Sequence, residues 1–282
     1  MRAPIVTVPA RTMLGCARVA YHVVNVARGP WRTKQVEVTR DHLRWSLDLR
    51  EGIDLSIYLF GAFEPSVVRR YPRLVSPGDV VVDIGANVGA HTLPLARAAG
   101  GSGRVFAFEP TTWAFAKLEA NLALNHSLGA RVTAEHALLV SPDHRAVPAE
   151  IYSSWPLVSG SELHALHRGM LKGTDGARAV TLDDYLAGDR VNFVKLDVDG
   201  AEPEVLAGAA ATIERSRPVM VIEMAPCAYE GSDGFERIVG FLTSRRYRLE
   251  HLRTRRPLPA DPDALAARIP DGSSMNVLCV PE

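Results

Sequence analysis

The 282-residue chain has only three cysteines, and their positions exclude a disulfide framework. Cys16, Cys227 and Cys279 are far apart, odd in number and without the short spacings that bind zinc or carry redox chemistry. Small secreted domains that depend on disulfides are much richer in cysteine. The cysteine pattern therefore fits a reducing compartment, and we expect the protein to be cytoplasmic.

Net charge and long apolar runs are absent as well. The 32 Lys and Arg residues balance 32 Asp and Glu residues, which argues against a nucleic-acid partner held by phosphate contacts. No apolar run is long enough for an integral membrane segment. Residues 13–26 are apolar, but Arg18 and His22 interrupt them and the polar residues recur at helical spacing. This predicts an amphipathic helix that packs on the domain or, alternatively, lies on a membrane or partner surface.

Glycine-rich phosphate-binding loops are also missing. A dinucleotide site has Gly-x-Gly-x-x-Gly after its first strand, and a P-loop has Gly-x-x-x-x-Gly-Lys-Ser/Thr. The loop after the apolar run 80–84 reads Gly-Ala-Asn-Val-Gly-Ala over residues 85–90, so it lacks the middle and final glycines of the dinucleotide pattern. This disfavours a nicotinamide-dependent oxidoreductase.

The sequence does contain two apolar strands that each deliver an acid near the carboxyl end. Asp83 lies in the run 80–84 and Glu109 ends the run 105–109. Ligands bind outside the carboxyl ends of strands in open parallel sheets. One carboxylate suits an ammonium group and the other a ribose diol, so the pattern predicts a site for S-adenosylmethionine (SAM). The predicted cofactor-binding residues are Asp83, Gly85, Ala86, Asn87, Gly89, Thr92, Glu109 and Pro110.

Strands and helices alternate along most of the chain. This order predicts an α/β fold with a Rossmann-like sheet that is mostly parallel and has one antiparallel strand. Residues 1–75 are expected to form an N-terminal extension of helices and strands and a lid, and residues 76–282 the main domain. Residues 141–176 have little periodicity and are interpreted as hairpin and loop. Further strands are expected at residues 131–139, 191–197, 218–224, 247–252 and 276–280.

A second group of charged residues lies at the end of the predicted strand 191–197. Lys195 and Asp197 are two residues apart, so they share a face of the sheet. Asp199 and Glu202 belong to the following turn, and Glu223 ends the next strand. Several carboxylates on one rim repel each other unless a cation, proton or substrate is shared among them. The group therefore predicts either a divalent metal site or a general base.

The predicted catalytic residues are Lys195, Asp197, Glu202 and Glu223. The predicted ligands for a metal such as Mg²⁺ are Asp197, Glu202 and Glu223. The alternative is structural, with Lys195 and Asp197 as an ion pair and Glu202 as a helix cap.

Several motifs together resemble the FkbM family of SAM-dependent methyltransferases, in order, from about residue 61 to residue 280. They are Asp-Ile-Gly-Ala-Asn-Val-Gly at 83–89, Phe-Glu-Pro at 108–110, Asn-Leu-Ala-Leu-Asn at 121–125, Leu-Asp-Asp-Tyr at 182–185, Lys-Leu-Asp-Val-Asp-Gly-Ala-Glu at 195–202, Leu-Ala-Gly-Ala at 206–209 and Arg-Pro at 217–218. The resemblance implies a seven-stranded class I methyltransferase fold and methyl transfer from SAM, usually to a hydroxyl of a sugar or polyketide-type natural product. One departure is visible, since the family more often has Glu where this chain has Asp199.

With this resemblance, the sequence predicts a SAM-dependent O-methyltransferase that acts on a small-molecule hydroxyl. Two alternatives are an NAD-dependent oxidoreductase and a methyltransferase-like binding module without catalytic activity. The sequence leaves open whether the protein is a homo-oligomer, and it does not identify the acceptor.

Overall fold

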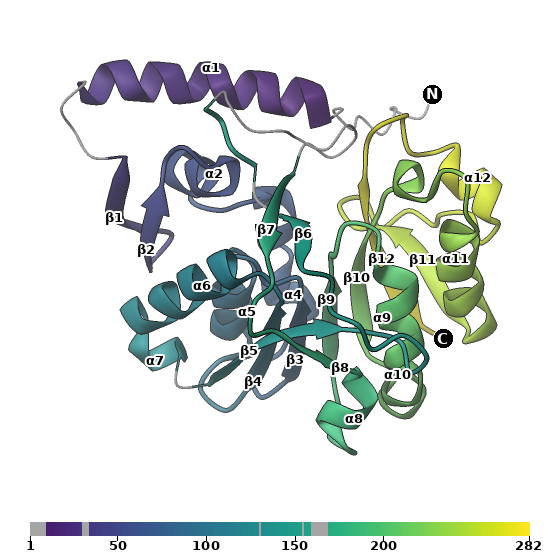
Figure 1. Cartoon of the computed structure of the whole chain (residues 1–282). Coiled ribbons are helices and arrows are strands. Elements are labelled where there is room, and N and C mark those ends of the chain that lie inside the picture. The colour runs from purple at the N-terminus through teal and green to yellow at the C-terminus, as the bar shows by residue number, and fades with distance from the viewer. Residues whose placement is uncertain (1–9, 30–33, 130, 154, 159–168) are drawn as a thin grey trace.

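The computed structural model describes residues 10–29, 34–129, 131–153, 155–158 and 169–282. A sheet of eight strands forms its centre, in the order β11-β12-β10-β9-β3-β4-β5-β8 (Figure 1). Only the pairs made by β12 are antiparallel, so the prediction of one antiparallel strand is confirmed. The strands are β3 (Val80–Ile84), β4 (Arg104–Glu109), β5 (Val132–Leu139), β8 (Arg178–Val180), β9 (Phe193–Leu196), β10 (Val219–Met224), β11 (Tyr247–His251) and β12 (Met275–Pro281). The three-residue β8 is the strand that the sequence did not predict.

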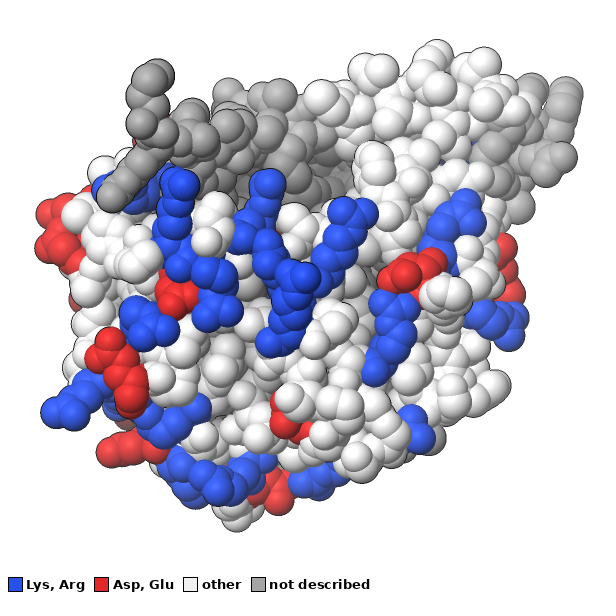
Figure 2. Space-filling view, turned by 180° about the vertical axis from the view of Figure 1, so that it is seen from behind, with Lys and Arg blue, Asp and Glu red and all other residues white. Residues whose placement is uncertain are grey.

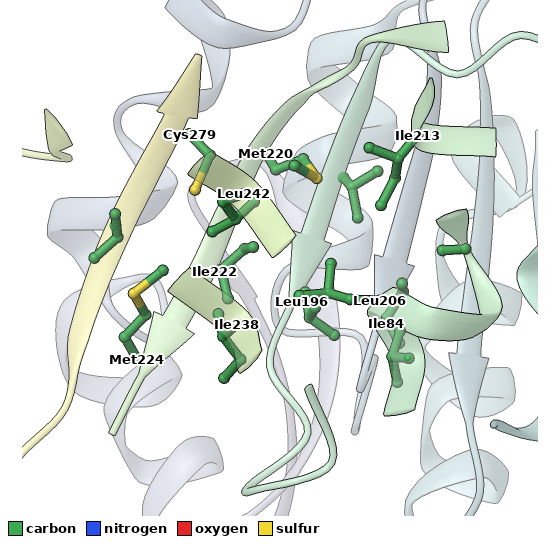
Figure 3. Close-up of a cluster of buried hydrophobic side chains, with 14 of the residues drawn as sticks. Ile84, Leu196, Leu206, Ile213, Met220, Ile222, Met224, Ile238, Leu242 and Cys279 are labelled. Carbon is green, nitrogen blue, oxygen red and sulfur yellow. The ribbon is translucent and has the colours of Figure 1, made fainter. Parts of the chain in front are cut away.

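Helices cover both faces of the sheet, because its central strands are apolar on both sides. Ile84, Leu196 and Ile222 face one core cluster, which helices α8 to α11 cover (Figure 3). Val81, Phe193 and Val221 face the other, together with residues of α4 and α5. The helices are α5 (Thr92–Ala99), α6 (Thr112–Leu124), α7 (His126–Gly129), α8 (Leu182–Leu186), α9 (Glu202–Gly208), α10 (Ala210–Ser216), α11 (Gly234–Ser244) and α12 (Pro262–Ala266), with the short 3₁₀ helix η1 (Pro226–Tyr229).

The N-terminal extension packs beside the carboxyl ends of β3 and β4. Its buried side chains, among them Trp45 and Leu55, form a third core cluster with Val88 and Leu93 of the main domain. The elements are α1 (Ala10–Arg28), β1 (Gln35–Arg40), β2 (Leu43–Asp48), α2 (Gly52–Phe60), α3 (Pro65–Val68) and α4 (Tyr71–Leu74). The expected hairpin within residues 141–176 is formed by β6 (Glu150–Ser153) and β7 (Met170–Gly173). In the described part of the chain, no helix combines the length and apolar character needed to cross a membrane.

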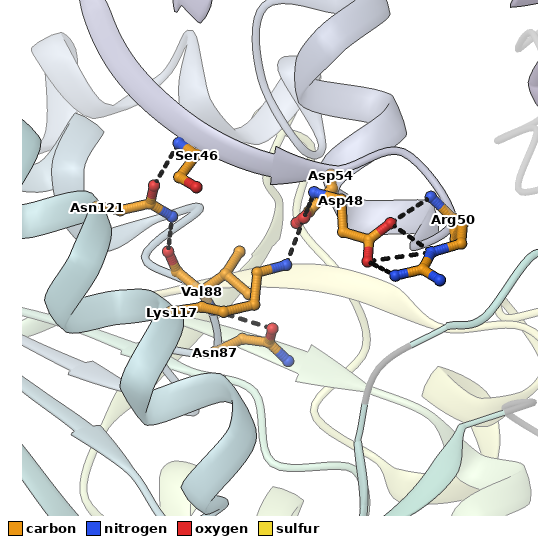
Figure 4. A network of polar contacts seen from close by, with 8 residues as sticks. All are labelled: Ser46, Asp48, Arg50, Asp54, Asn87, Val88, Lys117 and Asn121. Atoms are coloured by element: carbon orange, nitrogen blue, oxygen red, sulfur yellow. Dashed lines mark hydrogen bonds and ion pairs between the residues drawn. The ribbon is translucent and has the colours of Figure 1, made fainter. Parts of the chain in front are cut away.

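Polar contacts tie the extension to the loop that follows β3 (Figure 4). The fully buried Asn121 accepts a hydrogen bond from the Ser46 amide at 2.8 Å and donates to the Val88 carbonyl at 2.9 Å. Nearby, the Asp54 carboxylate accepts from the Asp48 amide at 2.6 Å and from Lys117. Buried polar groups must be satisfied in this way, so these bonds fix the loop relative to the extension.

Candidate active site

A cavity of about 490 Å³ lies at the carboxyl ends of β3, β9, β10 and β11, where β12 begins. This volume falls within the range of small-molecule sites. Its floor combines the loop after β3 with the carboxylates that follow β9 and β10. Its walls come from the N-terminal extension, from Trp155, and from residues 251–253 and 272–276 near the C-terminus. The sheet therefore brings together the two groups of residues that the sequence singled out separately.

Gly85 is required by contact between the loop and the end of β9. Its φ of +81° lies in the left-handed region, and a Cβ atom there would be 1.8 Å from the Asp197 carbonyl oxygen. The sequence analysis names this glycine as a cofactor-binding residue, but the structure gives a reason for it in the fold itself. Gly85, Ala86 and Asn87 all line the cavity.

Glu109 lies directly behind this loop and is almost completely buried. One carboxylate oxygen accepts from the Asn87 amide at 3.0 Å, and the other accepts from the amide and hydroxyl of Thr111 at 2.8 and 2.5 Å. Burial raises the pKa of Glu109, and these donors oppose the rise. Glu109 therefore holds the Asn87 backbone in place, and its predicted contact with ribose remains a proposal.

The other predicted cofactor residues also lie behind the loop. Asp83 is buried and accepts a hydrogen bond from the Thr92 hydroxyl at 2.6 Å. A Cβ atom at Gly89 would be 3.0 Å from the Leu118 side chain, so this glycine permits packing on α6. Of the eight predicted residues, Asp83, Gly89, Thr92, Glu109 and Pro110 are absent from the cavity lining. The local pattern did not distinguish the residues that line the cavity from those that lie behind the loop, and the cofactor-binding role of the loop remains a proposal.

Lys195, Asp197 and Glu223 form a connected group. The Lys195 ammonium is fully buried and lies 2.7 Å from an Asp197 carboxylate oxygen, as the two-residue spacing predicted. Burial alone raises the pKa of Asp197, but Lys195 and a hydrogen bond from Glu223 outweigh it and bring the pKa to about 2. Burial and the Asp197 charge raise the pKa of Glu223 well above its ordinary value. In its protonated form Glu223 donates a hydrogen bond to the ionised Asp197 carboxylate.

Asp199 completes the acidic group. Its backbone is left-handed, with a φ of 50°, and its side chain is open to the cavity. Close surrounding protein, with the charges of Asp197 and Glu202, raises the pKa of Asp199 to about 8 even though solvent reaches it through the cavity. Carboxylate oxygens of Asp197, Asp199 and Glu223 lie within 4.8 Å of one another, a spacing that could hold a metal ion.

Glu202 also lines the cavity but lies outside the set of acids spaced to share a metal ion, and its predicted catalytic and metal-binding roles remain a proposal. Its carboxylate accepts from the amides of Val198 and Gly200, each at 3.1 Å, and from the Tyr229 hydroxyl. These donors occupy both oxygens, so Glu202 fixes the turn after β9. The alternative raised from the sequence, a helix cap, differs from this arrangement, because the carboxylate binds amides of the preceding turn and α9 has no side-chain cap.

A third group in the cavity was not predicted from the sequence. His91 is buried; its Nδ1 is 2.7 Å from the Tyr71 hydroxyl, and its Nε2 is 3.4 Å from a Glu64 carboxylate oxygen. Asn276 donates to the other Glu64 oxygen at 2.8 Å. Burial raises the pKa of Tyr71 well above its ordinary value, so its hydroxyl keeps its proton and can donate it to Nδ1. Because these residues are far apart in the chain, no local sequence pattern predicts their contacts.

Comparison with known families identifies the family of the chain. The model of the methyltransferase FkbM domain matches residues 83–249, which is more than half of the chain. The chain belongs to the FkbM family. It is thus a member of a family of SAM-dependent methyltransferases with the class I methyltransferase fold, as the motif resemblance implied. This disfavours the oxidoreductase alternative. No curated protein gives a significant match.

Solved structures that resemble the chain include three methyltransferase-type proteins of low identity. A methyltransferase FkbM from Methylobacillus flagellatus is 17% identical with a TM-score of 0.44; the match covers 75% of this chain but only 50% of that one. A SAM-dependent O-methyltransferase from Thermotoga maritima is 16% identical with a TM-score of 0.42, covering 88% and 86% of the two chains. Aeropyrum pernix fibrillarin with bound SAM is 12% identical with a TM-score of 0.44, covering 89% and 85%.

Proposed function

We propose that this FkbM-family protein transfers the methyl group of SAM to a hydroxyl oxygen of a small molecule of the sugar or polyketide type, in the cytoplasm. The observation that carries the proposal is the single cavity that joins the Gly85–Asn87 loop to Asp197, Asp199 and Glu223. The loop provides bare backbone for the cofactor, and the acids lie where an acceptor hydroxyl would be activated. Much of the barrier would be lowered by alignment of the two reactants.

The residues present fit SAM in chemistry as well as in space. Gly85, Ala86 and Asn87 offer backbone groups at the cavity floor, and the buried Glu109 carboxylate supports Asn87 from below. Glu109 is not part of the cavity lining, and its contact with the ribose hydroxyls is part of this proposal. When bound, SAM supplies an electrophilic methyl group, and the protein holds the loop that positions it.

We assign the hydroxyl proton to Asp199 and not to Asp197. With a pKa of about 2, Asp197 is ionised but is a weak base, whereas a pKa near 8 is well matched to accept a proton near neutral pH. Asp197 and Glu223 then act as a pair that shares one proton and sets the charge around Asp199. The buried Lys195 ammonium keeps Asp197 ionised by lowering its pKa.

A divalent ion such as Mg²⁺ is the alternative way to activate the hydroxyl. Asp197, Asp199 and Glu223 would hold it, since hard cations prefer carboxylate oxygen ligands. Its positive charge would lower the pKa of the acceptor hydroxyl. Loss of activity with EDTA and recovery with Mg²⁺ would support this version, and full activity in EDTA would support Asp199 as the base.

The test begins with calorimetry of the purified protein. SAM and S-adenosylhomocysteine should bind and NAD should not; binding of NAD without binding of SAM would overturn the proposal. Methyl transfer is then assayed against a panel of glycosides and polyketide alcohols by mass spectrometry. Matched panels of amines and of carboxylic acids separate oxygen from nitrogen acceptors and hydroxyl from carboxylate acceptors. SAM binding without transfer to any acceptor would favour a non-catalytic binding module.

A further inference from the structure

Helix α1 has apolar side chains on both its inner and its outer face. Its inner face, which includes Ala17, Ala20, Tyr21 and Val24, packs against the third core cluster. On its outer face, Val19, Val23 and Val26 are 67%, 60% and 66% exposed. These three valines follow the helical spacing of four and three residues, so they form one row along the outside of the helix. The fold leaves this row without a partner within the described residues.

Charge is distributed unevenly around this helix. Residues 1–36 contain six Lys and Arg residues and no Asp or Glu, whereas the remaining 246 residues contain 26 basic and 32 acidic residues. The protein is therefore neutral overall but strongly basic in the segment that contains α1. The exposed Arg18 and His22 lie one helical turn apart, along one side of the valine row. In Figure 2 the ridge at the upper right, where α1 lies, shows neither acidic nor basic atoms and is therefore an uncharged surface in this view.

We propose that α1 binds the surface of a membrane that contains anionic lipids. An interfacial helix places an apolar row between the lipid headgroups and basic side chains beside them. Among its described side chains, α1 has the valine row and the exposed Arg18 beside it. The basic segment would add attraction to the negative lipid surface. Because α1 packs on α2, whose Ile53 lines the cavity, binding in this way would also hold the cavity close to the membrane.

A second copy of the chain is a poorer occupant of the same face. Pairing two α1 helices through their valine rows would bring two basic segments of the same sequence together. Like charges in close contact repel each other, whereas an anionic surface is complementary to them. The proposal does not depend on the methyltransferase activity, because α1 contributes no residue to the cavity lining.

The test is sedimentation of the full chain with lipid vesicles. One set of vesicles is phosphatidylcholine alone, and in the other about a third of the lipid is phosphatidylserine. We expect binding to the phosphatidylserine vesicles at about 0.1 M salt, at least about tenfold weaker binding to phosphatidylcholine, and a clear loss at about 0.5 M salt. Equal binding to both compositions, or no binding to either, would overturn the proposal.

Two double variants distinguish the contribution of the valine row to vesicle binding from the effect of added negative charge. Val19→Asp with Val23→Asp should reduce vesicle binding at least about tenfold. Val158→Asp with Leu171→Asp, at exposed apolar positions outside α1, adds the same negative charge and should bind nearly as well as the native chain. Binding of S-adenosylhomocysteine and thermal melting check that both variants are folded. If the α1 variant binds vesicles normally, or if its only effect is to convert a dimer to a monomer, the face has another occupant and the proposal is wrong.

Discussion

Replacement of Lys195 by methionine should destabilise the protein strongly at neutral pH. The ammonium is buried, with a side-chain exposure of 1%, and lies 2.7 Å from the Asp197 carboxylate. Methionine fills similar space but leaves Asp197 ionised beside Glu223 without a neighbouring cation from β9. Breaking a buried ion pair by removing one partner costs about 3–5 kcal/mol. Since Asp197 keeps 22% exposure toward the cavity, we expect the lower end, about 3 kcal/mol.

The pH dependence of this loss has a definite sign. In the native chain the lowered pKa of Asp197 contributes stability that is present above its ordinary value of 3.8 and is lost as pH falls through about 2. In the variant, burial acts on Asp197 without Lys195, so its pKa rises and protonation relieves the penalty at mildly acidic pH. The difference in unfolding free energy between the two proteins should therefore be largest near pH 7 and shrink toward pH 4.

Urea denaturation at several pH values measures this difference. Arg104→Gln is the control, because it breaks an exposed ion pair with Asp189 that should contribute less than about 1 kcal/mol. The double variant Lys195→Met with Asp197→Asn should recover much of the lost stability, since no buried charge remains unpaired. A loss below about 1 kcal/mol at pH 7, or one that does not change with pH, would refute this account of the buried pair.

Three further predictions concern the cavity. Glu109→Ala should weaken SAM binding by about 10- to 100-fold, because charge-assisted hydrogen bonds of about 1.5–3 kcal/mol are lost. Calorimetry measures this affinity. Unchanged affinity would leave Glu109 without a role in the site. Gly85→Ala should abolish SAM binding and also lower the melting temperature, since its Cβ would meet the Asp197 carbonyl, whereas Gly240→Ala, which has open space, should melt normally. Asp199→Asn should lose most turnover while keeping SAM affinity. Because the raised pKa of Asp199 means that stability is lost as pH rises through about 8, this variant should melt higher than the native chain at pH 9, and an equal or lower melting temperature there would count against the raised pKa.

The sequence was most informative where a local pattern fixes geometry. Apolar runs located the central strands, and the two-residue spacing correctly predicted that Lys195 and Asp197 share a face. Prediction was poorer in turns. Glu202 was expected to join the acidic group, but the left-handed backbone at Asp199 and the positive φ of Gly200 turn the chain so that Glu202 caps the turn. All four acids line the cavity, but the hydrogen-bond partners of each depend on torsion angles that residue type alone does not determine.

Contacts between distant segments were beyond local reasoning. His91 precedes helix α5 directly, and the α3–α4 segment covers it and brings Glu64 and Tyr71 against its ring. The extension was expected to form a lid, and Phe63 and Glu64 do line the cavity, but their approach depends on packing of the extension as a whole. These contacts form only when the whole chain has folded, so no short stretch of the sequence predicts them.

The contact between Gly85 and the Asp197 carbonyl has a consequence for how new specificities could arise in this scaffold. At the floor of the cavity the loop after β3 packs directly against the end of β9, with no room for a side chain at position 85. The walls, in contrast, come from residues 53–67, Trp155 and residues 251–276, which are far from the floor in sequence. Exchange of these wall segments could therefore retune the choice of acceptor while the floor stays intact, which makes them the natural targets for recombination between related chains.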